Sequence, residues 1–353
     1  MTRMSIGRTF AGGLAALAVT TALCGCSSSG GPFAGTSPDG SGGVVDQTLA
    51  RSSALASALD SLPYLPNVSV AFTDWAMLGH RAAADGYAAP FAEELLAADT
   101  DMEKDLGIRS TSADWEIDRW PAAGGAGTFV LGFDRHTDLA GMAGKLTRFG
   151  YRADGPIFTG SFDRRHMWTL GLRHIGIDTG RHLLAGGPDA SAVRSVLAGS
   201  GSPLGHASSV TPLLALAAAK LDRIATALVV VGSGACVKLA GLVRNASPQL
   251  LANLRKRFTG TFTPPQAELA ALKDPAAATG LDALAFADHR AAQANKAGRS
   301  AATNVLNGAD PNGPRVTHSA VTGRVLGFTV AAGQPHGFVQ GVEARTLGVD
   351  ICP

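Results

Sequence analysis

The sequence lacks a surplus of charge of either sign. It has 30 Lys and Arg residues against 28 Asp and Glu residues. Two of the basic residues, Arg3 and Arg8, lie in the first 25 residues, so the remainder is neutral (30 − 2 = 28 against 28). A neutral chain without a basic run has no electrostatic means of holding nucleic acid. We therefore expect no nucleic acid partner.

Motifs for metals and cofactors are also lacking. Nine histidines are scattered without HExxH spacing, so no metal site is indicated. An apolar strand runs into Gly232 and Gly234, but Val237 stands where a dinucleotide-binding turn has its third glycine. Ser233 has no glycine two places away on either side, so it does not form a nucleophile elbow. We expect a tight turn there and no cofactor.

Long apolar runs are rare, and the longest, residues 10–23, follows Arg3 and Arg8. It is too short to span a bilayer and is typical of an export signal. It ends in Leu23-Cys24-Gly25-Cys26, which resembles the lipobox of bacterial lipoproteins. The resemblance implies cleavage after Gly25 and a diacylglyceryl anchor on Cys26, at the extracytoplasmic face of the cell membrane. It covers the signal peptide (1–25) and Cys26 alone.

The segment after the anchor is rich in Ser, Gly and Pro through residue 43. We interpret residues 26–43 as the lipidated cysteine and a flexible tether with an r.m.s. span of about 20–25 Å. The folded part resembles no family. Its high content of Ala and Gly is typical of a GC-rich bacterium, for instance an actinobacterium.

Only two of the four cysteines remain after such processing, Cys236 and Cys352. Outside the cytosol a remaining pair favours a disulfide. Closing a loop of 116 residues (352 − 236) contributes roughly 4–5 kcal/mol in the loop-entropy model. The alternative is two unrelated buried thiols.

Periodicity predicts an α+β fold with mostly antiparallel sheets and packed helices. Helices are expected at 45–62, 91–99, 136–150, 190–198, 210–221, 247–258 and the later part of 281–308. Strands are expected at 67–75, 128–134, 157–162, 167–172, 174–178, 182–187, 225–232, the start of 281–308, and as a pair in 316–333. Residues 130–146 and 283–299 look alike, with His136 and His289 at matching places. This similarity predicts two copies of one unit, at 44–200 and 201–353.

Residues 112–120, SADWEIDRW, form the candidate site. If they are extended, Asp114, Glu116, Asp118 and Trp120 share one face, and Trp115, Ile117 and Arg119 share the other. Paired carboxylates beside tryptophans are typical of glycosidases, and a row of carboxylates can also hold Ca²⁺. A solvated strand face shows the same pattern.

A second Asp-Trp pair, Asp74 and Trp75, would join this site if the two pairs meet in space. All four tryptophans and all three tyrosines lie in the first half, where they would line a groove for a sugar or lipid or fill the larger core.

Three functions remain open. The first is a non-catalytic, lipid-anchored envelope protein that binds or scaffolds an envelope protein, a sugar or a lipid. The second is a solute-binding lipoprotein of a transporter, which fits the 328 residues after cleavage (353 − 25). The third is a glycosidase-like envelope hydrolase that uses Asp114, Glu116 and Asp118.

Overall fold

The computed structural model describes residues 53–79, 99–121, 127–239 except 164, 247–307, and 312–352 except 335 and 344. The predicted signal peptide, Cys26 and the tether lie outside these residues. Within the described ranges, no helix is both long enough and apolar enough to cross a membrane.

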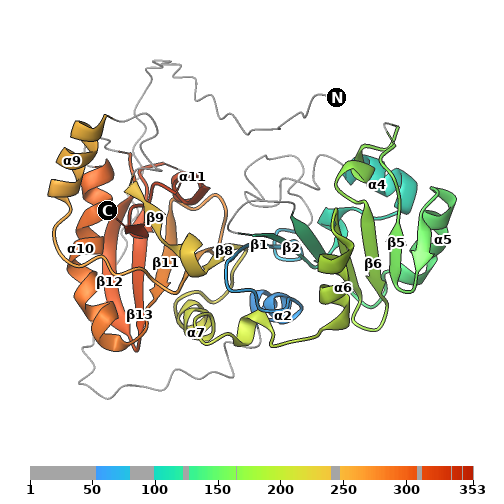
Figure 1. Cartoon of the computed structure of the whole chain (residues 1–353), viewed down its shortest axis with the longest axis horizontal. Coiled ribbons are helices and arrows are strands. Elements are labelled where there is room, and N and C mark those ends of the chain that lie inside the picture. The colour runs from blue at the N-terminus through green and yellow to red at the C-terminus, as the bar shows by residue number, and fades with distance from the viewer. Residues whose placement is uncertain are drawn as a thin grey trace, which may run out of the picture. The chain divides into compact units, whose positions relative to one another are not determined.

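The described residues build one sheet of twelve strands, and every pairing within it is antiparallel (Figure 1). Its order is β12-β13-β11-β10-β8-β1-β2-β3-β7-β6-β5-β4. The strands of the first half are β1 (Val68–Asp74), β2 (Trp115–Pro121), β3 (Thr128–Gly132), β4 (Arg152–Asp154), β5 (Ile157–Thr159), β6 (His174–Asp178) and β7 (Leu183–Gly187). Those of the second half are β8 (Thr226–Val231), β10 (Ala267–Leu272), β11 (Thr279–Ala285), β12 (Arg315–Thr322) and β13 (Val325–Ala331). The predicted α+β class is confirmed.

Helices pack on both faces of this sheet. One face, here called the α2–α7 face, carries α2 (Ala54–Asp60), α6 (Ala190–Ala198) and α7 (Thr211–Lys220). The other, here called the α5–α10 face, carries α4 (Asp99–Leu106), α5 (Leu139–Arg148), α10 (His289–Asn307) and α11 (Gly337–Glu343). The remaining helices are α9 (Pro248–Arg257) and the short 3-10 helices η2 (Ser110–Ser112), η3 (Met167–Leu170), η4 (Leu204–His206) and η5 (Gly232–Ala235).

Strand alternation explains which side chains face which layer. In β1, Val68, Val70 and Phe72 join the core under α2 and α7, and the residues between them face the opposite side. Above this strand α2 begins at Ser53, whose hydroxyl accepts a hydrogen bond from the backbone N–H of Ala56 at 3.1 Å. The α2–α7 face is therefore mostly apolar in the middle of the sheet, where buried Arg119 of β2 is an exception.

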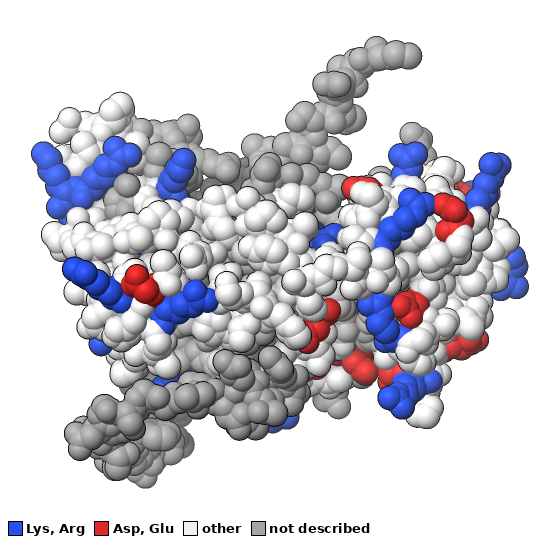
Figure 2. Space-filling model, turned by 60° about the horizontal axis from the view of Figure 1, so that its bottom comes forward, with Lys and Arg blue, Asp and Glu red and all other residues white. Residues whose placement is uncertain are grey.

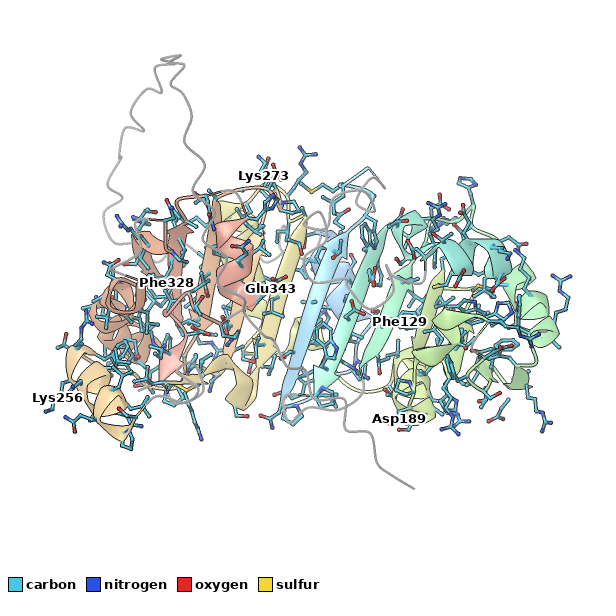
Figure 3. The ribbon with its side chains drawn as sticks, turned by 90° about the horizontal axis from the view of Figure 1, so that it is seen from above. Phe129, Asp189, Lys256, Lys273, Phe328 and Glu343 are labelled. Atoms are coloured by element: carbon cyan, nitrogen blue, oxygen red, sulfur yellow. A yellow bond between two sulfur atoms is a disulfide. The ribbon has the colours of Figure 1, made fainter. Side chains whose placement is uncertain are left out.

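The two halves repeat one strand order. The first runs β1-β2-β3-β7-β6 outward from the centre, and the second runs β8-β10-β11-β13-β12. A helix precedes the first strand in each half (α2, α7), and another follows the third strand (α5, α10). The halves meet where β1 pairs with β8, so they share one sheet. Figure 3 shows the row of strands from above, with Phe129 on the side of the first half and Phe328 on that of the second. The domain limits at residues 200 and 201 stay predictions.

Some expected elements differ from the structure. Residues 167–172 are not a strand, since Met167–Leu170 form η3. Strand β10, AELAAL, was not expected because its residues favour helix, yet burial between β8 and β11 makes it a strand. The helix expected at 91–99 lies outside the described residues except for Asp99, where α4 begins.

The C-terminus is fixed to the second half. Cys236 and Cys352 form the predicted disulfide, with their Cα atoms 5.7 Å apart. Beside it β9 (Val237–Lys238) and β14 (Ile351–Cys352) form a short parallel pair. Buried Arg299 of α10 donates from Nη1 to the carbonyl oxygens of Val349 (2.6 Å) and Ile351 (3.1 Å). A covalent bond and buried hydrogen bonds thus hold the same segment.

Candidate functional site

The predicted candidate residues lie in neighbouring strands. Residues 115–121 form β2 next to β1, and Asp74 stands opposite Trp115. The indole Nε1–H of Trp75 donates to Oε2 of Glu116 at 2.8 Å. The two Asp-Trp pairs therefore do meet in space, through Trp75 and the residue after the second pair.

The faces of β2 separate as the alternation predicts. Ile117 lies in the core of the α2–α7 face, and half-buried Trp115 packs against that core. Glu116 and Asp118 face the other side, where they are only 1% and 3% exposed. These two acids therefore do not lie on a solvated strand face. Among the other candidates, Asp74, Asp114 and Trp120 are half-buried and Trp75 is fully buried.

Burial controls the electrostatics of Glu116. Loss of water raises the pKa of its carboxyl well above the usual range, and the nearby charge of Asp118 raises it further. The hydrogen bond from Trp75 acts in the opposite direction, because it stabilises the ionised form. Oε1 of Glu116 has no hydrogen-bond partner among the described residues. Glu116 is thus a carboxyl that keeps its proton at a pH where an exposed glutamate has lost it.

A second cluster of buried acids lies in the other half. Nη2 of Arg345 contacts Oε2 of Glu268 at 2.7 Å and Oδ2 of Asp350 at 2.9 Å. Asp282 is fully buried, and neither of its carboxylate oxygens has a hydrogen-bond partner among the described residues. Fully buried Arg299 also acts on the charges of this cluster. The second half therefore holds its acids together with guanidinium groups.

Burial sets the pKa values here too, and the arginines modify them. Burial raises the pKa of Glu268 and Arg345 lowers it, which leaves it at about 7. Burial also raises the pKa of Asp282 well above its usual range, with the charge of Glu268 adding to the effect. Burial lowers the pKa of Arg299 to about 10. For Arg345 burial lowers the pKa, but the charges of Glu268 and Asp350 outweigh it and raise the net value.

The two clusters occupy equivalent places. Glu116 and Glu268 each lie on the second strand of their half, opposite a leucine of the third strand, Leu131 or Leu284. The look-alike segments 130–146 and 283–299 align these same two leucines.

Two residues further along the second strand, each half has an aspartate in the cross-strand pair, but on a different strand. In the first half Asp118 stands opposite Phe129. In the second half Ala270 stands opposite Asp282. Each half thus places one glutamate and one aspartate in equivalent cross-strand pairs on the α5–α10 face. The sequence signal for the second cluster is this internal alignment, which places Leu131 and Leu284 at matching positions.

The carboxylate of Asp105, whose side chain is 7% exposed, is a further buried acid that the sequence did not indicate. Its Oδ2 accepts from the indole Nε1–H of Trp168 at 2.8 Å and lies 2.5 Å from Nδ1 of His166. Tyr151 stacks on Trp168 with 5.8 Å between ring centroids. Trp75, Trp168 and Tyr151 are all buried, so these aromatic residues fill core positions and line no groove. Tyr64 is exposed, and Tyr87 lies outside the described residues.

Other predicted motifs have local structural roles. Gly232 begins η5 with a φ of +76°, and a Cβ there would lie 2.1 Å from the carbonyl oxygen of Pro66, so this glycine makes the tight turn possible. The backbone N–H of His136 donates to Asp134 at 2.9 Å. The ring of His289 instead bonds the carbonyl oxygen of Gly323 at 2.7 Å. The two matched histidines therefore have different partners.

The chemistry open to these clusters is limited. Among the described residues, no group of three His, Cys, Asp or Glu side chains is arranged to hold a metal ion. Glu116, Asp118, Glu268, Asp282 and Asp350 are each at most 3% exposed. A sugar polymer could not reach a carboxyl buried to this degree.

Comparisons with known proteins do not assign this chain to a family. No protein-family model matches the chain, and no curated protein matches it. Solved structures similar to it include two crystal forms of a protein named TP0453. Form III has a TM-score of 0.39 at 13% identity and covers 81% of this chain and 98% of the other. Form I has a TM-score of 0.41 at 10% identity and covers 82% and 97%.

Proposed function

We propose that the chain is a lipid-anchored protein of the bacterial cell envelope with a non-catalytic binding or scaffolding role. The observation that carries this proposal is the order of the first 43 residues: basic start, apolar run, Leu23-Cys24-Gly25-Cys26 and a Ser/Gly/Pro tether. Two acyl chains on Cys26 would hold a folded domain stably at a membrane, which a single chain does not.

The disulfide supports the same compartment. Disulfides persist in oxidising surroundings outside the cytosol and are rare within it. Cys236 and Cys352 are bonded, and Cys24 would leave with the signal. After acylation of Cys26 the mature chain would have no free thiol.

A binding role fits the structure better than catalysis by the predicted acids. Glycosidases need two carboxyls about 5–9.5 Å apart on either side of a bound sugar. Glu116 and Asp118 are instead packed in the interior. A solute-binding role predicted two lobes with βαβ alternation, whereas the described strands form one continuous antiparallel sheet.

The anchor is tested by changing one cysteine at a time. The full chain is expressed in an actinobacterial host and labelled with an alkyne analogue of palmitate. Cys26→Ala should lose the label and leave the detergent phase on partition. Cys24→Ala is the matched control and should keep both properties. Labelling that follows Cys24 instead, or that persists without Cys26, would refute the assignment.

A further inference from the structure

The α2–α7 face is covered unequally in the two halves. In the first half α6 follows the last strand and places Val193 and Val196 in the core of this face. In the second half the helix after the last strand is α11, and its Phe338 and Val339 pack on the opposite face. Among the described residues, α7 alone therefore covers the outer strands β11, β13 and β12 on the α2–α7 face.

Strand register shows what this difference leaves open. In the first half Gly176 of β6 pairs with Ala185 of β7, and in the second Ala320 of β12 pairs with Gly327 of β13. Aliphatic side chains of α6 cover the first pair: a Cβ on Gly176 would lie 2.4 Å from Leu197. In the second half Leu216 of α7 covers the β13 residue of the pair, since a Cβ on Gly327 would lie 2.7 Å from it. Beside Leu216, the same pair lines a cavity of about 190 Å³.

The lining of this cavity is apolar with a basic edge. Leu216, Leu221 and Leu281 contribute aliphatic groups. Lys220, at the C-terminal end of α7, also lines it and is exposed, as is His318 of β12. Among the described residues Lys220 makes no ion pair, since the nearby Asp222 pairs with Lys273 at 2.8 Å.

The surrounding surface agrees with this arrangement. Figure 2 brings the α2–α7 side forward and shows charged side chains most densely on the right, over the first half. To the left of centre the charged side chains gather mainly in two groups, with uncharged surface between them. An apolar lining and an ammonium group that forms no ion pair with a described residue together fit a ligand with an aliphatic chain and an acidic end.

We propose that the cavity between α7 and strands β11, β13 and β12 binds the acyl chain of an anionic amphiphile, with the acidic group at Lys220. A volume of about 190 Å³ is similar to that of an apolar cavity of about 150 Å³ that takes a benzene molecule. The cavity therefore takes part of a chain, and the rest would lie along the open strands. This ligand class extends the proposed binding role and does not depend on the anchor at Cys26.

The test uses the chain from Ser27 to Pro353, which keeps every described residue and carries no lipid of its own. Dodecanoate is titrated into it by calorimetry, with dodecanol as the neutral probe of the same length. We expect saturable binding of dodecanoate that is at least fivefold tighter than that of dodecanol. Ala320→Leu should weaken both at least tenfold, because the added side chain fills the cavity. Thr322→Leu, on the same strand and outside the lining, should change neither.

The charged edge is tested separately. Lys220→Glu should weaken dodecanoate about tenfold and leave dodecanol unchanged, and Lys238→Glu is the matched change at an exposed lysine elsewhere. Vesicles of dioleoyl phosphatidylglycerol form a second arm. Binding of the fatty acid alone identifies a free acid as the source, and binding of vesicles that Lys220→Glu abolishes identifies a lipid headgroup; either result supports the proposal.

Three results would overturn it. The first is the absence of saturable binding of both dodecanoate and vesicles, and the second is binding that Ala320→Leu leaves intact. The third is a dimer that Ala320→Leu converts to a monomer while no amphiphile binds, which would assign this face to a second copy of the chain. All three leave the Cys26 labelling result unaffected, so failure here is distinct from failure of the anchor.

Discussion

The two halves of the sheet bury their acids at equivalent positions but compensate them differently. Glu116 has the neutral indole of Trp75 and a second carboxyl, Asp118, as its neighbours. Glu268 has the guanidinium of Arg345, which also contacts Asp350. In the first half burial raises the pKa of Glu116 with no cation to oppose it among its named partners. In the second half the charge of Arg345 opposes the effect of burial and leaves the pKa of Glu268 at about 7.

The C-terminal segment accounts for this difference. Arg345 and Asp350 lie beyond the last strand of the repeated order, in the segment that ends at the disulfide. In the first half the last strand, β7, is followed by α6, which packs on the α2–α7 face. The extra C-terminal segment brings Arg345 and Asp350 to the buried Glu268. Stability in the second half therefore depends on residues that the first half does not have.

The largest effect is expected from Arg345→Met. This change leaves Glu268 and Asp350 buried without their shared cation, and removing one partner of a buried ion pair costs about 3–5 kcal/mol. Urea unfolding of the chain from Ser27 measures it. Arg315→Met, at an exposed arginine of the same half, is the control and should stay within about 0.5 kcal/mol. A loss below about 1 kcal/mol for Arg345→Met would mean that the network is not formed.

Removal of the disulfide should come next. The double change Cys236→Ala and Cys352→Ala should lower the free energy of unfolding, because the unfolded chain regains the entropy of a long loop. We expect a loss of about 2–4 kcal/mol, since measured losses are commonly smaller than the loop-entropy value. Urea unfolding with and without reductant checks this, since reductant should affect only the parent chain. Thiol titration of the denatured parent should find no free thiol, and two thiols would contradict the bond.

A smaller loss is expected from Trp75→Phe in the first half. It removes the donor to Oε2 of Glu116 and leaves that oxygen buried without it, which costs about 1–3 kcal/mol. The pKa of Glu116 should rise further, since the hydrogen bond from Trp75 lowers it. Trp120→Phe, at a half-buried tryptophan of β2, provides the comparison by urea unfolding. Equal losses for the two changes would show that lost packing, and not the hydrogen bond, explains the result.

The smallest effect should be that of Glu116→Gln at pH 5. Glutamine is neutral and of similar shape, and Glu116 is itself protonated in the folded state at that pH, so we expect a change below about 1 kcal/mol. Above its usual pKa of 4.5 the unfolded chain releases this proton while the folded chain keeps it. The folded state then binds more protons, so stability falls as pH rises.

Replacing Glu116 should remove part of that fall. Unfolding measured from pH 5 to 8 should show a shallower decline for Glu116→Gln than for the parent chain. Glu268, with a pKa of about 7, contributes its own decline between about pH 4.5 and 7, which the variant keeps. An unchanged pH profile would mean that Glu116 is already ionised in the folded protein.

Much of the fold could be predicted where local signals agree with the final packing. The helix predicted at 190–198 has the same bounds as α6. Local signals agree with them, since Asp189 caps the start and Gly199 ends the helix in the left-handed conformation with a φ of 55°. Strand β10 could not be predicted, because nothing local in AELAAL opposes a helix. Its structure comes from the partners β8 and β11.

The candidate site was predictable in its geometry and not in its burial. Alternation indicated that Glu116 and Asp118 share a face, but it carries no information about what covers that face. The cluster around Glu268 depends on Arg345, 77 residues away in the sequence and held in a turn with a φ of 56°. A contact at such a distance in the sequence leaves no local pattern from which to predict it.

The pairing of β1 with β8 sets an order of assembly. On one side of β1, the strands β2, β3 and β7 all lie within residues 68–187. On the other side β1 pairs with β8, so Val68 can pair only after the chain has reached Val231. Until then β1 has a free row of backbone N–H and C=O groups, which any extended chain can join. A chain that ends near residue 200 would thus expose β1 as an edge strand and be prone to aggregation. The second half protects the first by covering this edge with β8.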